Sequence, residues 1–336
     1  MTAALTTTPA APPAARTGAA SRQLRWLLRL HRPAVVTGAA VTLLLGAALL
    51  WLGGPLTDAS AAAWKEYDAC GFTPRCSYDQ DSILAYKDLY NYTTFAVLVL
   101  PFLVAAWAGG SLTGRELESG TARLAWTQSV SPARWLAHRL ALPAVLTLTA
   151  TGLTAWLHRM AWTAGENRVD HTKPWHDAAT FYANGTVPLA LALAGLALGV
   201  LAGLLLRRAM AALATAAVAL GVLWALVHTA LPHLWSPVTK VSDLATGPSG
   251  SGLHVGEGVL TADGDRLAAP CVSGSMHGCR ATLDELGAVS FYRDFHPESH
   301  FWPLQLVASG ILLAVAALLT YAAFQVVRRT TGTARG

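Results

Sequence analysis

The chain has 336 residues, of which 53% are hydrophobic and 13% are charged, whereas a typical soluble domain carries about 25% charged residues. This deficit and the long charge-free runs place the chain among integral membrane proteins. None of its four lysines follows a glycine, so the Gly-Lys-Ser/Thr of a P-loop is absent. The chain itself is therefore not expected to bind ATP by that route.

The N-terminal region has two parts. Residues 1–20 are mainly Ala, Thr and Pro, a composition that predicts a disordered tail. Residues 21–33 contain four arginines spaced three, four and three apart, with leucines and Trp26 between them. This pattern predicts a basic amphipathic helix on an anionic membrane surface, and a plain juxtamembrane anchor is the alternative.

Six apolar stretches follow, each close to the roughly 20 residues that a helix needs to cross a bilayer. Only Arg207 and Arg208 separate the fourth from the fifth, so we predict a tight hairpin turning at these two residues. The predicted fold is an all-α integral membrane protein with six transmembrane helices, at about 34–52, 92–112, 140–157, 187–206, 209–231 and 303–327.

Arginine distribution predicts the orientation. Six spans put both termini on one side, and that side carries 14 of the 24 basic residues but only two acidic ones, Glu116 and Glu118. The other side keeps 10 basic and 17 acidic residues. By the positive-inside rule, both termini, the loop 113–139 and the tail 328–336 are cytoplasmic. The loops 53–91, 158–186 and 232–300 are then extracellular.

All four cysteines fall in these extracellular loops, which suggests disulfides on the oxidising side of the membrane. Four cysteines allow three pairings. We prefer Cys70–Cys76 and Cys271–Cys279, because short-range pairing needs no assumption about tertiary contacts.

Two segments of the last extracellular loop could suggest ligand chemistry, but neither pattern is convincing. His296 and His300 do not form the His-Glu-x-x-His pattern, and Pro297 disfavours a regular helix through them, so no metal site is predicted. Residues 246–258 are rich in Gly and Ser and are expected to form a flexible loop. Because the spans hold no Asp, Glu, Lys or Arg, energy for any transport should come from another chain.

Gly195, Gly199 and Gly203 repeat every four residues in the fourth span. Such a stripe of small residues lets a second helix approach closely. It could serve a dimeric or moving interface, or ordinary helix packing within one subunit.

The loop 113–139 is charged and aromatic, and its sequence predicts two short helices joined at a bend. Thr113 to Glu116 fits a capping box, and Gly120 would loosen or end the first helix. Ser131 and Pro132 fit an N-cap and first residue of the second helix. Trp126 and Trp135 suit an interfacial depth. A connector anchored by aromatics and arginines is the simpler interpretation.

The run Arg115-Glu-Leu-Glu-Ser-Gly-Thr-Ala-Arg-Leu-Ala-Trp-Thr-Gln-Ser-Val closely resembles a block found in permease subunits of ABC-2 type transporters, especially the actinobacterial branch. Weaker matches flank it, at Gly185 to Pro188 with the Arg207–Arg208 hairpin, and at Phe301, Trp302 and Gln305. The branch tends to have charged residues where this chain has His300 and Ala308.

The resemblance implies a six-span exporter subunit that works as a homodimer or pseudo-dimer with two separate ATP-binding subunits, which hold the ATP and magnesium. The loop 113–139 would couple to them, and charge complementarity makes its ionic residues candidates for docking. Membrane lipid is a further expected partner and nucleic acid is not. A non-transporting scaffold or sensor that binds a partner through the same loop is the alternative, and a metal-dependent enzyme in the extracellular loops is a third. The coupling candidates are Arg115, Glu116, Glu118, Gly120, Thr121, Arg123 and Arg134.

Overall fold

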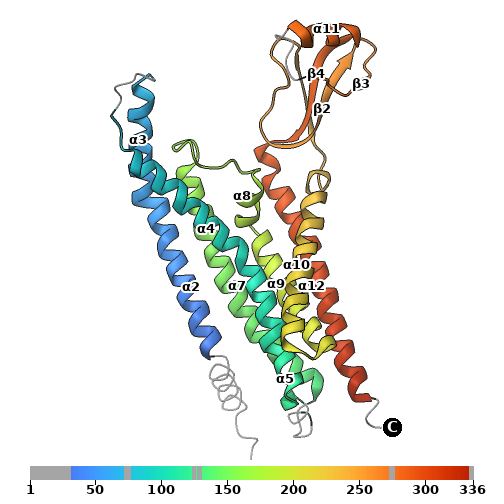
Figure 1. The fold of residues 1–336 in the computed structure, drawn as a ribbon. Coiled ribbons are helices and arrows are strands. Elements are labelled where there is room, and N and C mark those ends of the chain that lie inside the picture. Colours follow the sequence, from blue (N-terminus) through green and yellow to red (C-terminus); the bar gives the residue numbers. More distant parts are fainter. Residues whose placement is uncertain (1–31, 72–76, 123–125, 127–130, 272–276, 333–336) are drawn as a thin grey trace, which may run out of the picture. The chain divides into compact units, whose positions relative to one another are not determined.

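The computed structural model describes residues 32–71, 77–122, 126, 131–271 and 277–332 (Figure 1). The expected tail 1–20 and nearly all of the expected helix 21–33 lie outside this part. Residues 32–44 form one unit, a stretch of helix with exposed apolar side chains such as Leu43, and the residues from Leu45 onward form the other.

The predicted fold class is confirmed, because six helices among the described residues are long and apolar enough to cross a membrane. Several are longer than the predicted spans, so much of the loop expected at 53–91 is helical. The six helices run over Arg32–Ala69, Gln80–Glu118, Pro132–Gly165, Val187–Leu206, Ala209–His233 and Glu298–Arg329.

The first two of these helices are compound. Helix α2 (Arg32–Trp51) continues through the π-helical segment η1 (Leu52–Leu56), where Gly54 leaves helical geometry beside Pro55, into α3 (Thr57–Ala69). The next begins at Asp79, whose side chain accepts from the Ser82 amide at 3.1 Å. It comprises α4 (Gln80–Trp107), the π-helical η2 (Ala108–Gly114) and the short α5 (Arg115–Glu118).

Helix α7 (Pro132–Gly165) begins as predicted, because the Ser131 hydroxyl accepts from the Arg134 amide at 3.4 Å and Pro132 occupies the first turn. The hairpin of α9 (Val187–Leu206) and α10 (Ala209–Ala230) also turns at the predicted arginines. Arg207 takes a left-handed conformation, with φ 54°, and thereby ends α9.

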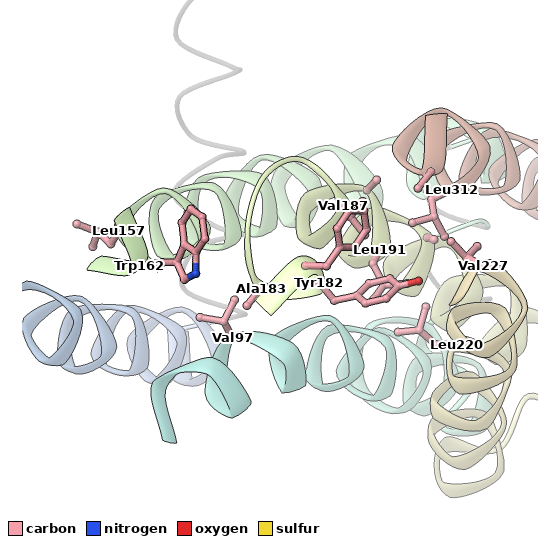
Figure 2. Close-up of a cluster of buried hydrophobic side chains, with 14 of the residues drawn as sticks. Val97, Leu157, Trp162, Tyr182, Ala183, Val187, Leu191, Leu220, Val227 and Leu312 are labelled. Atoms are coloured by element: carbon pink, nitrogen blue, oxygen red, sulfur yellow. The ribbon is translucent and has the colours of Figure 1, made fainter. Parts of the chain in front are cut away.

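Helix α9 is central to the fold. It is apolar all round, and α4, α7, α10 and α12 (Phe301–Gly332) pack against it. Figure 2 shows Val187 and Leu191 of α9 among Val97 of α4, Leu220 of α10 and Leu312 of α12. A helix apolar on all sides must be covered on all sides by protein or lipid.

The segment between α7 and α9 is more ordered than a plain extracellular loop. It contains α8 (Ala178–Ala183), capped by the Asp177 side chain, and Phe181 and Tyr182 of this helix are buried. Asn184 follows, completely buried and extended. The sequence reading did not anticipate this inserted segment.

An antiparallel sheet is the largest unpredicted feature. It has the strand order β1-β4-β2-β3, and α11 (His277–Glu285) contributes Cys279 and Leu283 to its small apolar core. The predicted Cys271–Cys279 disulfide is present there. Cys70 is also disulfide-bonded, but Cys76 lies outside the described residues. The strands are β1 (Val238–Asp243), β2 (Leu253–Thr261), β3 (Arg266–Leu267) and β4 (Ala288–His296).

The expectation of a flexible loop at 246–258 is wrong for its second half, because residues from Leu253 onward belong to β2. Gly258 allows this, since a β-carbon there would collide with the Leu267 carbonyl oxygen and the Tyr292 ring. The chain leaves the helical bundle through η3 (Leu231–His233) before the sheet and returns to it through η4 (Glu298–His300) after the sheet.

Candidate functional site

The π-helix η2 carries α4 directly into the stretch that the sequence singled out. Its glycines bring the backbone close to α9 and α10, and a β-carbon on Gly109 would lie 2.7 Å from the Ala212 carbonyl oxygen. Thr113 is completely buried, with its hydroxyl 3.3 Å from the Val200 carbonyl oxygen. The predicted capping box is wrong, because the continuous helix leaves no free N-terminus for Thr113 to cap.

Glu116 forms a nearly buried ion pair with Arg139 of α7. Its Oε1 lies 2.5 Å from Nη2 of Arg139, and the two side chains are 18% and 7% exposed. Desolvating two charges is costly, so such a pair tolerates removal of both partners far better than removal of one. The pair therefore ties α5 to the start of α7.

Glu118 makes the second link, to α10. Its Oε2 accepts from the Ala209 backbone N–H at 2.9 Å. Ala209 is the first residue of α10, and Arg208 before it provides no side-chain cap. A carboxylate here satisfies an otherwise open amide and interacts favourably with the helix dipole.

A compact turn follows Glu118. The Thr121 hydroxyl donates to the Glu116 carbonyl oxygen at 3.2 Å and lies 3.0 Å from the Ser119 hydroxyl. Gly120 has φ 76°, a left-handed conformation that favours glycine and that ends α5 as predicted.

The two tryptophans of the loop pack edge to face, with ring centroids 5.6 Å apart. Trp135 is buried in an apolar cluster with Leu112, Leu136 and Val327. Its surroundings are therefore other side chains of this chain, and the interfacial depth expected from the sequence stays a prediction. The cluster fixes the loop on the helical bundle.

The two described arginines among the coupling candidates are at the surface. Arg115 and Arg134 are exposed, and neither forms an ion pair among the residues that the structure describes. Arg123 lies outside those residues. The geometry thus separates the candidates, since Glu116 and Glu118 bind within the chain while the two arginines remain accessible.

The glycine stripe of α9 lies against α4 and η2 of the same chain. A β-carbon on Gly195 would lie 2.8 Å from the Pro101 carbonyl oxygen, and one on Gly199 would lie 2.7 Å from the Gly109 nitrogen. Gly203 similarly faces Thr113 and Gly114. Packing within one subunit therefore occupies this stripe.

Sequence reasoning missed Arg139 as a site residue, counting it only as a positive charge near a span. The available signal was an arginine about two turns into this helix, beyond Trp135 and Leu136, at the point where the sequence becomes apolar. It also missed the inserted segment, whose Asn184 lies 2.8 Å from Nδ1 of His158 in α7, and Nε2 of this histidine lies 2.8 Å from the Thr94 hydroxyl in α4.

A family model described as "ABC-2 membrane transporter related" matches residues 39–231, which include η2, the turn, and the α9–α10 hairpin. The chain belongs to this ABC-2 family. No curated protein and no solved structure gives a match.

Membership makes the ABC-2 chain a multi-pass membrane protein and the membrane component of a transporter. ABC-2 permeases generally work with an ABC ATP-binding subunit. In the ABC-2 chain, the Glu116–Arg139 and Glu118–Ala209 contacts join α5 to α7 and to α10.

Proposed function

We propose that this chain is the membrane-spanning permease subunit of an ATP-driven ABC exporter, coupled to a separate ATP-binding subunit through the loop 113–139. The proposal includes both termini on the cytoplasmic side and a homodimer or pseudo-dimer of permease subunits. ATP and magnesium belong to the partner, since this chain has no P-loop lysine.

The observation that carries the proposal is the pair of links made by α5. Glu116 ties it to α7 at 2.5 Å, and Glu118 ties it to the first residue of α10 at 2.9 Å. A push on the turn would therefore reach two membrane helices through charged, directional contacts. A loop that served only as a tether would not need both.

The geometry also suggests that docking and transmission depend on different residues of the loop. Arg115 and Arg134 are exposed and basic, so they are suited to an acidic surface on the ATP-binding subunit. Glu116 and Glu118 are suited to transmission, because their carboxylates are already engaged within the chain. This refines the docking role that charge alone suggested for Arg115, Glu116, Glu118 and Arg123, the last of which lies outside the described residues.

The test begins with co-purification of the chain with the ATP-binding subunit encoded nearest to it, followed by ATP hydrolysis in liposomes. Replacing both Arg115 and Arg134 by Glu should abolish the complex. Glu118→Gln should leave the complex intact but reduce coupled hydrolysis, because a neutral amide is a weaker cap for α10.

Two outcomes would count against the proposal. A complex that is indifferent to the arginine reversals would place docking elsewhere. A stable complex whose partner binds but does not hydrolyse ATP would favour the alternative function, a scaffold or sensor that uses the same loop to bind a protein.

A further inference from the structure

Arg159 lies towards the C-terminal end of α7, away from the turn that follows Glu118. Aromatic rings surround its guanidinium group. Its guanidinium carbon lies 4.5 Å from the ring centre of Trp162 and 4.4 Å from that of Phe301 in α12. The Trp302 ring centre is 6.0 Å away. Rings that cover a guanidinium leave its N–H groups, which lie in its plane, directed past the rings.

Within the described part of the chain, no hydrogen-bond acceptor contacts the guanidinium. Its Nη1 atom is buried and has no partner among the described residues. Arginine remains charged in proteins, and a buried charged donor without an acceptor is strongly unfavourable. The side chain as a whole is only partly buried, so an acceptor from outside the chain can reach the same guanidinium at its other N–H groups.

Two carboxylates flank the elements that form this site, since Glu166 directly follows α7 and Glu298 lies three residues before Phe301. Glu166 and Glu298 attract Arg159 electrostatically, but neither forms an ion pair in the described part of the chain. Partial burial, and then the nearby Glu298, raise the pKa of Glu166. The site therefore presents one unpaired cation beside two carboxylates that repel each other.

The surface next to this site is apolar. Trp156 and Met160 of α7 are 60% and 38% exposed, and Trp302 and Leu306 of α12 are 50% and 60% exposed. Each pair is spaced four residues apart, so each follows one face of its helix. Exposed tryptophans are typical of the level where lipid head groups meet acyl chains.

We propose that the Arg159 site binds the head group of a zwitterionic aminophospholipid. The phosphate accepts hydrogen bonds from Arg159, and the ammonium group lies against Glu166 and Glu298. The acyl chains lie on the exposed strip formed by Trp156, Met160, Trp302 and Leu306. The lipid thus bridges α7 and α12.

The charge pattern favours a zwitterionic head group over an anionic or a cationic one. The two carboxylates disfavour a purely anionic head group, and Arg159 disfavours a purely cationic one. A zwitterion with phosphate and amine satisfies both. The inference goes beyond the proposed function, because such a site can exist whether or not the chain transports.

The test compares lipid retention by the full-length chain in native mass spectrometry. The probes are phosphatidylethanolamine and phosphatidylglycerol with identical acyl chains, supplied in equal amounts. Wild type should retain phosphatidylethanolamine about fivefold better, the factor expected when one partly exposed charge pair adds to binding. Equal retention of the two lipids would overturn the proposal.

Two variants test the phosphate contact and the ammonium contact separately. Arg159→Gln should reduce retention of both lipids about tenfold, since it removes a charge-assisted phosphate contact. Glu166→Gln combined with Glu298→Gln should bring phosphatidylglycerol up to the level of phosphatidylethanolamine. This second variant changes partly and fully exposed side chains, so it remains informative if Arg159→Gln fails to fold.

Arg168→Gln is the matched control. Arg168 is an exposed arginine paired with Asp58 at 2.8 Å, and its loss should leave retention unchanged. Reduced retention in this control would contradict a specific role for Arg159. Glycerophosphoethanolamine, the soluble head group, should not displace the lipid at equal concentration, and displacement would contradict the contribution of the apolar strip.

Discussion

Charge reversal at Glu116, at Arg139 and at both residues together tests whether this ion pair holds α5 against α7. Glu116→Arg places two guanidinium groups together in a site where the Arg139 side chain is only 7% exposed. Breaking a buried pair costs about 3–5 kcal/mol, and the 18% exposure of Glu116 argues for the lower end, about 3 kcal/mol.

Arg139→Glu should be about equally destabilising, because it leaves two carboxylates facing each other. The exchanged variant, which carries both substitutions, should recover at least half of the lost free energy of unfolding. Equilibrium unfolding of the purified chain in mixed micelles measures all four proteins. If the two losses simply add, the residues are not coupled, and the Glu116–Arg139 ion pair does not stabilise the chain.

The same variants separate transmission from docking. If Glu116 acts by holding α7, the exchanged variant should regain coupled ATP hydrolysis together with stability. If Glu116 instead touches the ATP-binding subunit, the exchanged variant should be stable but remain uncoupled. Restored stability without restored hydrolysis would therefore return Glu116 to the docking surface.

Three further predictions concern packing, the sheet and orientation. Gly199→Ala should destabilise the chain by about 1–3 kcal/mol, because the new methyl group meets η2, whereas Gly310→Ala, with open space around it, should be neutral or slightly stabilising in the same unfolding assay. Replacing Cys271 and Cys279 by Ser should cost the sheet about 2–3 kcal/mol and make it sensitive to protease, while helical circular dichroism is unchanged. A membrane-impermeant maleimide should label Ser119→Cys only from the cytoplasmic side and Ser251→Cys only from the outside, and the opposite pattern would reverse the proposed topology.

The helical part of the fold could be predicted because its signals are local. Long apolar runs set the spans, two adjacent arginines marked the α9–α10 turn, and Ser131 with Pro132 marked the start of α7. Each of these depends on residues close together in the chain. The capping box predicted at Thr113 was wrong, because the residue pattern matches a cap but Thr113 lies inside a continuous helix.

The sheet and the ion pair depend on long-range contacts and were harder to predict. Strand β2 contains two glycines that weaken its β-propensity, and it is stabilised by pairing with β4, some 30 residues later. Glu116 and Arg139 are likewise separated by a turn and the start of a new helix. Their residue types indicated a charged loop, but only the fold shows that they pair with each other.

The last prediction concerns the buried hydrogen bonds that hold the segment between α7 and α9 against α12. Gln305 of α12 is completely buried, and its Oε1 accepts from the Thr186 and Val187 amides, each at 3.0 Å. Its Nε2 donates to the Phe181 carbonyl oxygen at 2.8 Å. One side chain therefore joins the end of α8 and the start of α9 to α12.

Gln305→Met keeps the volume but leaves these three backbone groups without their partner. At about 1–1.5 kcal/mol for each, the free energy of unfolding should fall by about 3–4.5 kcal/mol. Ser309→Ala, one turn later, removes only a hydroxyl contact with Thr186 at 2.7 Å and should cost about 1 kcal/mol. Because apolar volume is preserved, equal losses in the two variants would show that packing, rather than these hydrogen bonds, holds the segment in place.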